Sequence, residues 1–134
     1  MKRICPAICF GLAILWNVGC TAPPKGAAPT ASVKGTVELD GKLVPSGELH
    51  FSIADYPPSV LQITNGTYSG EAPVGKNKVE VFIYVEGPAS EKYGGVRSTT
   101  NTAPEKYWGP NTTLDATVKA GEANEFKFKL TSKN

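Results

Sequence analysis

Apolar and polar residues alternate along most of the chain after residue 31, with the period of two that places successive side chains of a β-strand on opposite faces. In residues 32–40, Val33, Val37 and Leu39 fall on one side, and polar residues fill the other side. Six later segments are also strand-like: residues 48–53, 60–64, 67–70, 78–85, 113–119 and 125–131. No stretch after residue 20 has a helical period. The pattern therefore predicts an all-β domain, an Ig-like or prealbumin-like β-sandwich of six to seven strands.

Glycine-containing dipeptides mark the turns between these segments. Asp40-Gly41 lies between the first two segments and predicts that they form the first hairpin of the sandwich, over residues 32–53. Asn65-Gly66 is a dipeptide favoured in two-residue type I′ turns, and it predicts a hairpin of the two segments that it joins. Ala120-Gly121 predicts that the last two segments also pair as a hairpin.

Residues 78–85 are the most strand-like run and are apolar on both faces, with valine and isoleucine on one face and Phe82 and Tyr84 on the other. Such a strand is either covered on its second face or exposes its aromatic pair. Residues 87–112 carry no clear periodicity and are rich in Gly, Pro, Ser, Thr and Asn. We expect them to form one long loop, the segment most open to function.

The first 19 residues have the form of an export signal. Lys2 and Arg3 give a positive start, and a mostly apolar run follows that is too short to span a membrane comfortably. Val18-Gly19-Cys20 resembles the bacterial lipobox, in which Cys20 would be diacylated and become the new N-terminus, although Asn17 stands where an aliphatic residue is usual. Ordinary cleavage near Gly19 and an uncleaved anchor are the alternatives.

Residues 20–31 contain three prolines and no large apolar side chain, so they are expected to form a semi-extended tether before the domain at 32–131. Thr21, where inner-membrane lipoproteins would carry Asp, resembles the pattern of lipoproteins sent to the outer membrane. The expected location is the cell envelope, exported and anchored to a membrane through Cys20, at the outer membrane or the periplasmic face.

Charge and cysteine usage exclude several function classes. The formal net charge of +2 comes from Lys2 and Arg3, because the other 12 basic residues equal the 12 acidic ones in number. A balanced surface argues against nucleic acid as a partner. All three cysteines lie in the first 20 residues, so we expect no disulfide framework and no cysteine-based metal site in the domain. No metal or other cofactor is expected.

Several turn and core motifs together resemble one family. They are Val-Lys-Gly-Thr-Val-Glu-Leu-Asp-Gly-Lys-Leu-Val-Pro-Ser-Gly-Glu-Leu-His-Phe at 33–51, Gly-Thr-Tyr at 66–68, Pro-Val-Gly-Lys at 73–76 and Pro-Glu-Lys-Tyr at 104–107. The chain resembles, over about residues 32–130, the carboxypeptidase regulatory-like domains of bacterial envelope lipoproteins, also called transthyretin-like domains. The resemblance implies a non-catalytic β-sandwich that serves as a scaffold or binding module.

His50 is the only histidine, so a catalytic triad or a His-dependent metal site would have to use it. It alternates with Glu48 and Ser52 on the outward side of its segment, which predicts a solvent-facing residue with no specific role. Transthyretin-related hydrolases resemble this fold but use several histidines and a C-terminal Tyr-Arg-Gly-Ser motif. The chain has neither feature, and we therefore expect no enzymatic activity.

Four residues within the long loop are candidate ligand contacts: Tyr93, Arg97, Tyr107 and Trp108. In one interpretation they form a platform that stacks on sugar rings or grips a peptide. In the other, the rings hold the loop against the sandwich and cover the face of Phe82 and Tyr84.

Taken together, the sequence predicts an exported, lipid-anchored, non-catalytic module with a binding or structural role at the bacterial cell envelope, where the partner is an envelope protein or a glycan. The alternative is a carbohydrate-binding or carbohydrate-active accessory domain that works through residues 87–112.

Overall fold

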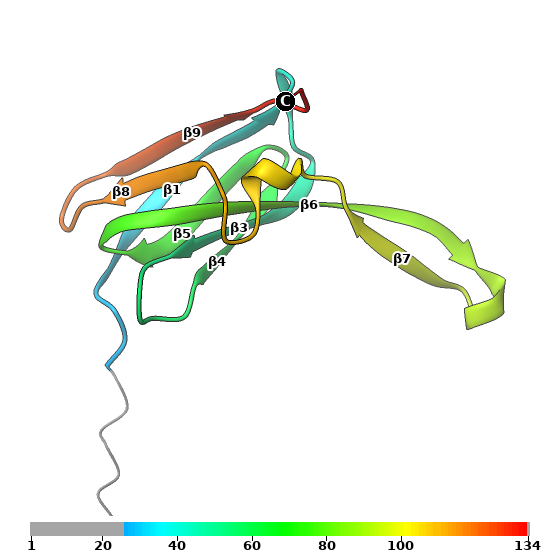
Figure 1. Ribbon diagram of the computed structural model, residues 1–134, viewed down its shortest axis with the longest axis horizontal. Coiled ribbons are helices and arrows are strands. Elements are labelled where there is room, and N and C mark those ends of the chain that lie inside the picture. Colours follow the sequence, from blue (N-terminus) through cyan, green and yellow to red (C-terminus); the bar gives the residue numbers. More distant parts are fainter. Residues whose placement is uncertain (1–25, 134) are drawn as a thin grey trace, which may run out of the picture.

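The computed structural model describes residues 26–133, and this part of the chain is all-β (Figure 1). The predicted signal, Cys20 and the tether up to residue 25 lie outside the described residues. Within residues 26–133 no helix is both long and apolar enough to cross a membrane. The elements are β1 (Thr30–Leu39), β2 (Lys42–Leu43), β3 (Ser46–Ser52), β4 (Ser59–Thr64), β5 (Thr67–Pro73), β6 (Gly75–Ser90), η1 (Glu91–Tyr93), β7 (Val96–Asn101), η2 (Glu105–Tyr107), β8 (Leu114–Val118) and β9 (Asn124–Leu130).

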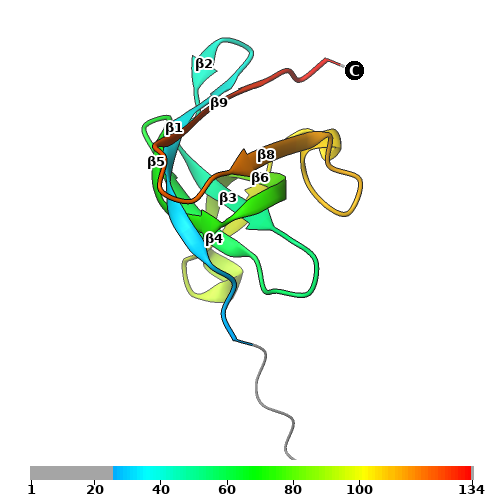
Figure 2. The same cartoon turned by 90° about the vertical axis from the view of Figure 1, so that its left-hand side faces the viewer.

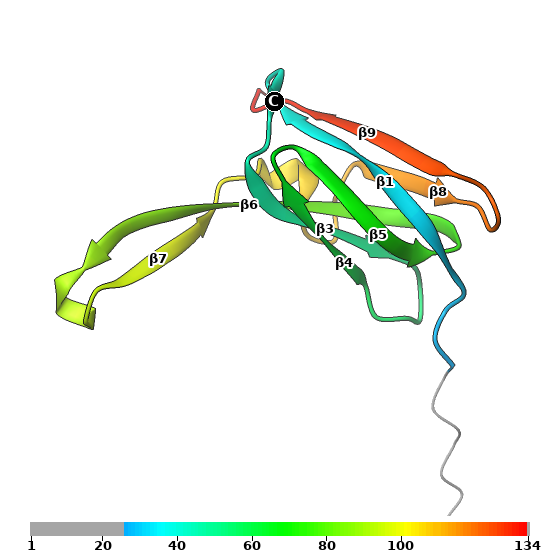
Figure 3. The ribbon, with the colours of Figure 1, turned by 180° about the vertical axis from the view of Figure 1, so that it is seen from behind.

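The strands form one curled sheet in the order β2-β1-β5-β4-β3-β6-β7, with β9 beside β1 and β8 beside β6. The pairing of β9 with β1 is parallel, and the other pairings are antiparallel. Only Thr64 and Thr67 are register partners between β4 and β5. The sheet therefore consists of two halves joined at one hairpin, β9-β1-β5 and β4-β3-β6-β8 (Figures 2 and 3).

The core lies between the two halves, where each strand turns its apolar side inward. Buried residues come from the first half (Val33, Val37, Tyr68, Ala72, Phe128, Leu130) and from the second (Leu49, Phe51, Leu61, Ile63, Val79, Val81, Ile83, Ala116, Val118). Phe51 of β3 is fully buried, and its ring centroid lies 6.3 Å from Tyr68, 6.4 Å from Phe126 and 6.3 Å from Phe128. This ring of the second half is thus enclosed by three rings of the first.

Two of the three predicted turn dipeptides have positive φ angles at both residues. Asn65 and Gly66 have φ angles of 50° and 78°, and Asp40 and Gly41 have 52° and 78°. Two successive positive φ angles are what a type I′ turn requires. The hairpin of β4 and β5 is confirmed.

The predicted first hairpin over residues 32–53 is wrong, because β1 does not pair with β3. Strand β1 turns back at Asp40 into the short strand β2, and the chain then passes through Val44 and Pro45 to the other half, where β3 pairs with β4 and β6. The last two strands do not form a hairpin either, since β8 pairs with β6 and β9 pairs with β1. Two strands that each have one apolar side can lie next to each other in the same half of the sheet, or face each other across the core. The apolar sides are buried in both arrangements, so alternation does not distinguish them.

Residues 87–112 are not one irregular loop. Strand β6 continues for 16 residues to Ser90, and β7 runs back along it, so that the two strands form a ribbon that projects from the body of the domain (Figure 1). We call residues 85–100 the arm; none of them is buried. Because no side of the arm is buried, its sequence carries no apolar alternation that would have predicted a strand, and its register also shifts between Glu86 and Ala89.

Side-chain hydrogen bonds fix the base of the arm. The Oδ1 atom of Asn101 accepts hydrogen bonds from the backbone N–H groups of Ile83 and Ala103, each at 3.0 Å. The arm therefore leaves the domain in a defined direction.

Replacing Phe51 with alanine should lower the free energy of unfolding by about 3–5 kcal/mol, because it opens a cavity at the point where the two halves meet. Urea denaturation measures the change. The control Tyr93→Ala removes a ring that is 68 % exposed on the arm and should change the stability by less than about 0.5 kcal/mol. Equal effects of the two substitutions would contradict the proposed core.

A chain in which Asn-Gly joins Val85 directly to Thr100 should fold with the same cooperativity as the natural chain. These two residues are register partners, so a two-residue turn can connect them, and the removed residues contribute no buried side chain. The free energy of unfolding should stay within about 1 kcal/mol. Loss of a cooperative urea transition would show that the arm supports the fold.

Candidate functional site

The outward side of the second half carries a group of contacting polar and aromatic side chains. Because β-strand side chains alternate, the core positions Leu49 and Phe51 of β3 leave Glu48 and His50 pointing outward. The register places Glu48 opposite both Gln62 of β4 and Phe82 of β6. Six residues form what we call the outer-face cluster: Glu48, His50, Gln62, Phe82, Tyr84 and Trp108.

Glu48 lies at the centre of the hydrogen bonds in this cluster. Gln62 Nε2 donates to its Oε1 at 3.1 Å, and the Tyr84 hydroxyl donates to its Oε2 at 3.3 Å. His50 Nε2 lies 3.2 Å from the same Oε2 and donates to it when that nitrogen carries the proton. The bonds from Gln62 and His50 lower the pKa of Glu48 below its ordinary value, although its partial burial opposes the shift. The carboxylate is therefore held in its ionised form.

Phe82 lies at the centre of the rings. Its ring centroid is 4.7 Å from that of His50 and 6.4 Å from that of Tyr84, whose plane is tilted by only 17°. Trp108 lies 6.4 Å away at 39°, and its Nε1 donates to the backbone oxygen of Ala103 at 3.0 Å. The rings that contact Phe82 therefore come from β3, from β6 itself and from the residue that follows η2.

The prediction that the His50 side chain faces solvent is only partly confirmed. The residue does lie on the outward side of β3, but its side chain is only 21 % exposed because it contacts Glu48 and the ring of Phe82. Alternation along β3 gives the side on which His50 lies. It does not reveal that β6, distant in sequence, places a phenylalanine next to it.

The four predicted contact residues fall into two separate groups. Tyr107 is buried, and its hydroxyl accepts a hydrogen bond from the backbone N–H of Thr131 at 3.0 Å, just after β9. Trp108 contacts the ring of Phe82 and packs partly against the core, as expected for a ring that holds the segment against the sheet. Tyr93 and Arg97 lie instead on the arm, which projects away from η2 (Figure 3). The structure does not bring the four side chains into one platform.

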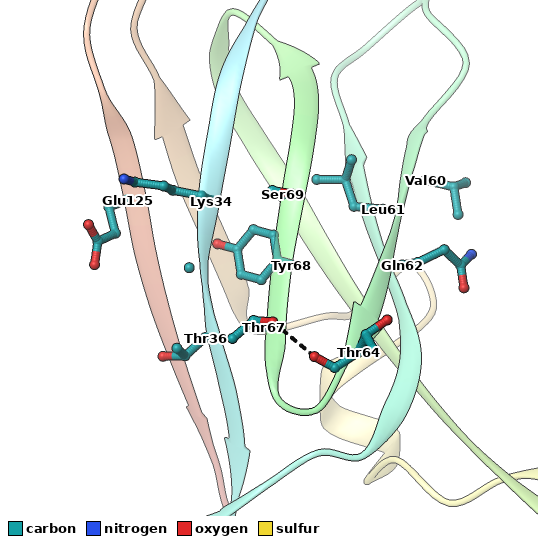
Figure 4. A pocket seen from close by; sticks show the side chains of 11 residues that line it. Lys34, Thr36, Val60, Leu61, Gln62, Thr64, Thr67, Tyr68, Ser69 and Glu125 are labelled. Carbon is teal, nitrogen blue, oxygen red and sulfur yellow. Dashed lines mark hydrogen bonds between the residues drawn. The ribbon is translucent and has the colours of Figure 1, made fainter.

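A groove opens where β4 and β5 diverge from their single paired position. It has a volume of about 710 Å³, and Lys34, Gln62, Tyr68 and Glu125 are among its lining residues. Figure 4 shows Leu61 pointing into the gap toward β5 and Thr67 bonded to Thr64 across the closed end, where the Thr67 hydroxyl donates to the Thr64 carbonyl at 2.9 Å. Sequence reasoning missed this groove because it depends on how far two paired strands separate.

Among residues 26–133 no group of three or more His, Cys, Asp or Glu side chains is placed to hold a metal ion. In the outer-face cluster an ionised carboxylate, an amide and an imidazole lie beside aromatic rings, an arrangement that suits recognition of a ligand.

Comparisons with family models, curated proteins and solved structures give no match for this chain. The resemblance to carboxypeptidase regulatory-like domains remains a prediction that rests on the sequence motifs.

The hydrogen bonds to Glu48 should make the stability of the domain depend on pH. Its pKa is lower in the folded chain than its ordinary value of 4.5, so the stabilisation is present above that value and is lost as the pH falls through the folded-state pKa. Glu48→Gln should therefore flatten the fall in unfolding free energy between about pH 5 and pH 3. The matched control, Glu91→Gln, changes a carboxylate on the arm. If both variants retained the natural slope, the hydrogen bonds to Glu48 would not stabilise the fold.

Proposed function

We propose that the chain is an exported, lipid-anchored, non-catalytic module that binds an envelope component or supports envelope structure. The observation that carries the proposal is the order of features at the N-terminus: an export-type segment at 1–19, Cys20 in a lipobox-like setting, and a proline-containing tether. Strand β1 begins at Thr30, so only a short stretch separates Cys20 from the sheet. The module would lie close to the membrane, at the outer membrane or the periplasmic face.

Two surface features support a binding role. The outer-face cluster places polar groups and rings on rigid strands, and the arm exposes Val85, Tyr93 and Val96. Neither feature contributes buried side chains to the hydrophobic core, apart from the partial packing of Trp108 against it. The expected partner is an envelope protein or a glycan, and the balanced charge disfavours nucleic acid. The family resemblance supports a non-catalytic role.

The alternative, a carbohydrate-binding or carbohydrate-active accessory domain acting through residues 87–112, keeps one supporting observation. Trp108 lies beside Phe82, and Phe82 is the register partner of the ionised Glu48. Because Tyr107 is buried and Tyr93 lies on the arm, a sugar contact by Trp108 would be completed by strand residues of the outer face and not by the rest of that segment.

The substitution Cys20→Ala should abolish incorporation of a labelled fatty acid and move the protein from the membrane fraction to the soluble fraction of cells. The physical reason is that the acyl chains would provide the membrane affinity, while the domain itself has a balanced charge. Thr21→Ala, next to the cysteine, is the matched control and should remain acylated. An unchanged acylated mass in the Cys20→Ala variant would refute the anchor.

A further inference from the structure

We propose that the outer-face cluster is a binding site for a neutral pyranose unit of a glycan. The apolar face of the sugar ring would lie on Phe82 and Tyr84, and its hydroxyl groups would bond to Glu48 and its neighbours. This inference rests on the proposed binding role and gives that role a site and a class of ligand.

The arrangement of the rings favours a flat ligand. Phe82 and Tyr84 are nearly parallel, with 17° between their planes, and their centroids are 6.4 Å apart on alternate residues of one strand. Trp108 also lies beside Phe82, with 6.4 Å between the two ring centroids and 39° between the ring planes. A cation site needs rings that converge on one charge. Phe82, Tyr84 and Trp108 are each partly exposed and instead offer neighbouring apolar surfaces, which match the C–H face of a pyranose.

The polar groups beside the rings complement hydroxyl groups. An ionised carboxylate offers about four acceptor positions, and Glu48 uses three of them for Gln62, Tyr84 and His50. One acceptor position therefore remains for a ligand hydroxyl, and a hydrogen bond to a charged acceptor is stronger than one between neutral groups. When Nε2 of neutral His50 donates to Glu48, its Nδ1 is a second acceptor.

The backbone at this site leaves no room for an added peptide strand. Strand β3 is paired with β4 on one edge and with β6 on the other, so its backbone groups are engaged within the sheet. Recognition here must use side chains, whereas strand addition requires a free edge such as those beside the groove between β4 and β5. A glycan needs no backbone partner.

The cluster is also held rigidly before any ligand binds. Glu48 is fixed by three donors, and the His50 ring is held between Glu48 and Phe82. Little side-chain entropy is lost when a ligand meets groups that are already fixed. The same side chains on a mobile loop would bind more weakly.

The test uses the fluorescence of Trp108 in the full chain. The protein has two tryptophans, so Trp16→Phe leaves Trp108 as the single indole. This chain, purified in lauryldimethylamine oxide, which has no sugar headgroup, is titrated with cellopentaose and with chitopentaose. We expect a saturable change in emission with at least one of them. Glu48→Gln and Phe82→Ala should each weaken the affinity at least about tenfold, and Lys119→Ala, at a distant turn, should leave it unchanged.

The results of these titrations distinguish binding at the outer-face cluster from binding on the arm and from no binding. Glu48→Gln keeps the shape of the side chain, so it tests the carboxylate even if Phe82→Ala disturbs the fold. Absence of a saturable change with either sugar up to about 20 mM would overturn the proposal. A titration that Glu48→Gln leaves unchanged, or that Tyr93→Ala on the arm abolishes, would overturn it as well. Membrane retention through Cys20 is measured separately and is unaffected by either result.

Discussion

The contact of the Phe51 ring with Tyr68, Phe126 and Phe128 determines how the two halves of the sheet lie against each other. Backbone pairing alone cannot do so, because β4 and β5 share one pair of register partners. In the first half of the sheet, the backbone of β9 approaches the backbone of β1 closely at Gly35. A Cβ atom added to Gly35 would lie 1.8 Å from the carbonyl oxygen of Phe126. A glycine at position 35 thus permits the β1–β9 pairing that brings the phenylalanines of β9 to Phe51.

Strand β3 links this core to the candidate site. Its inward residues Leu49 and Phe51 are fully buried, and its outward residues Glu48 and His50 alternate with them in sequence. The packing that holds the halves together therefore also fixes the backbone of the outer-face cluster. The arm differs in this respect, since its residues are not buried and its two strands pair mainly with each other. An isolated two-stranded ribbon is marginally stable in water, so a rigid site is better placed on β3 and β6 than on the arm.

Sequence reasoning succeeded where the determining interactions are local. Alternation identified the long strands and their inward residues, and Asn65-Gly66 identified a true turn. It failed for the pairing of β1 with β3 and of β8 with β9, because alternation shows that a side is buried but not which strand covers it. The arm was missed because none of its residues is buried, so its sequence carries no apolar alternation. The cluster around Glu48 was missed because it is formed by residues from β3, β4 and β6, which are distant in sequence. The role of Tyr107 and Trp108 as anchors was one of the two interpretations that the sequence left open.

The proposed recognition takes place through side chains on the rigid outer face and not through the arm. Chemical-shift mapping of the isotopically labelled full chain with chitopentaose and cellopentaose tests this claim most directly. The account predicts that the largest shifts occur at Glu48, His50, Phe82 and Trp108, while the arm residues from Val96 to Thr100 keep their positions. Shifts concentrated on the arm, or no shifts with either sugar, would contradict it.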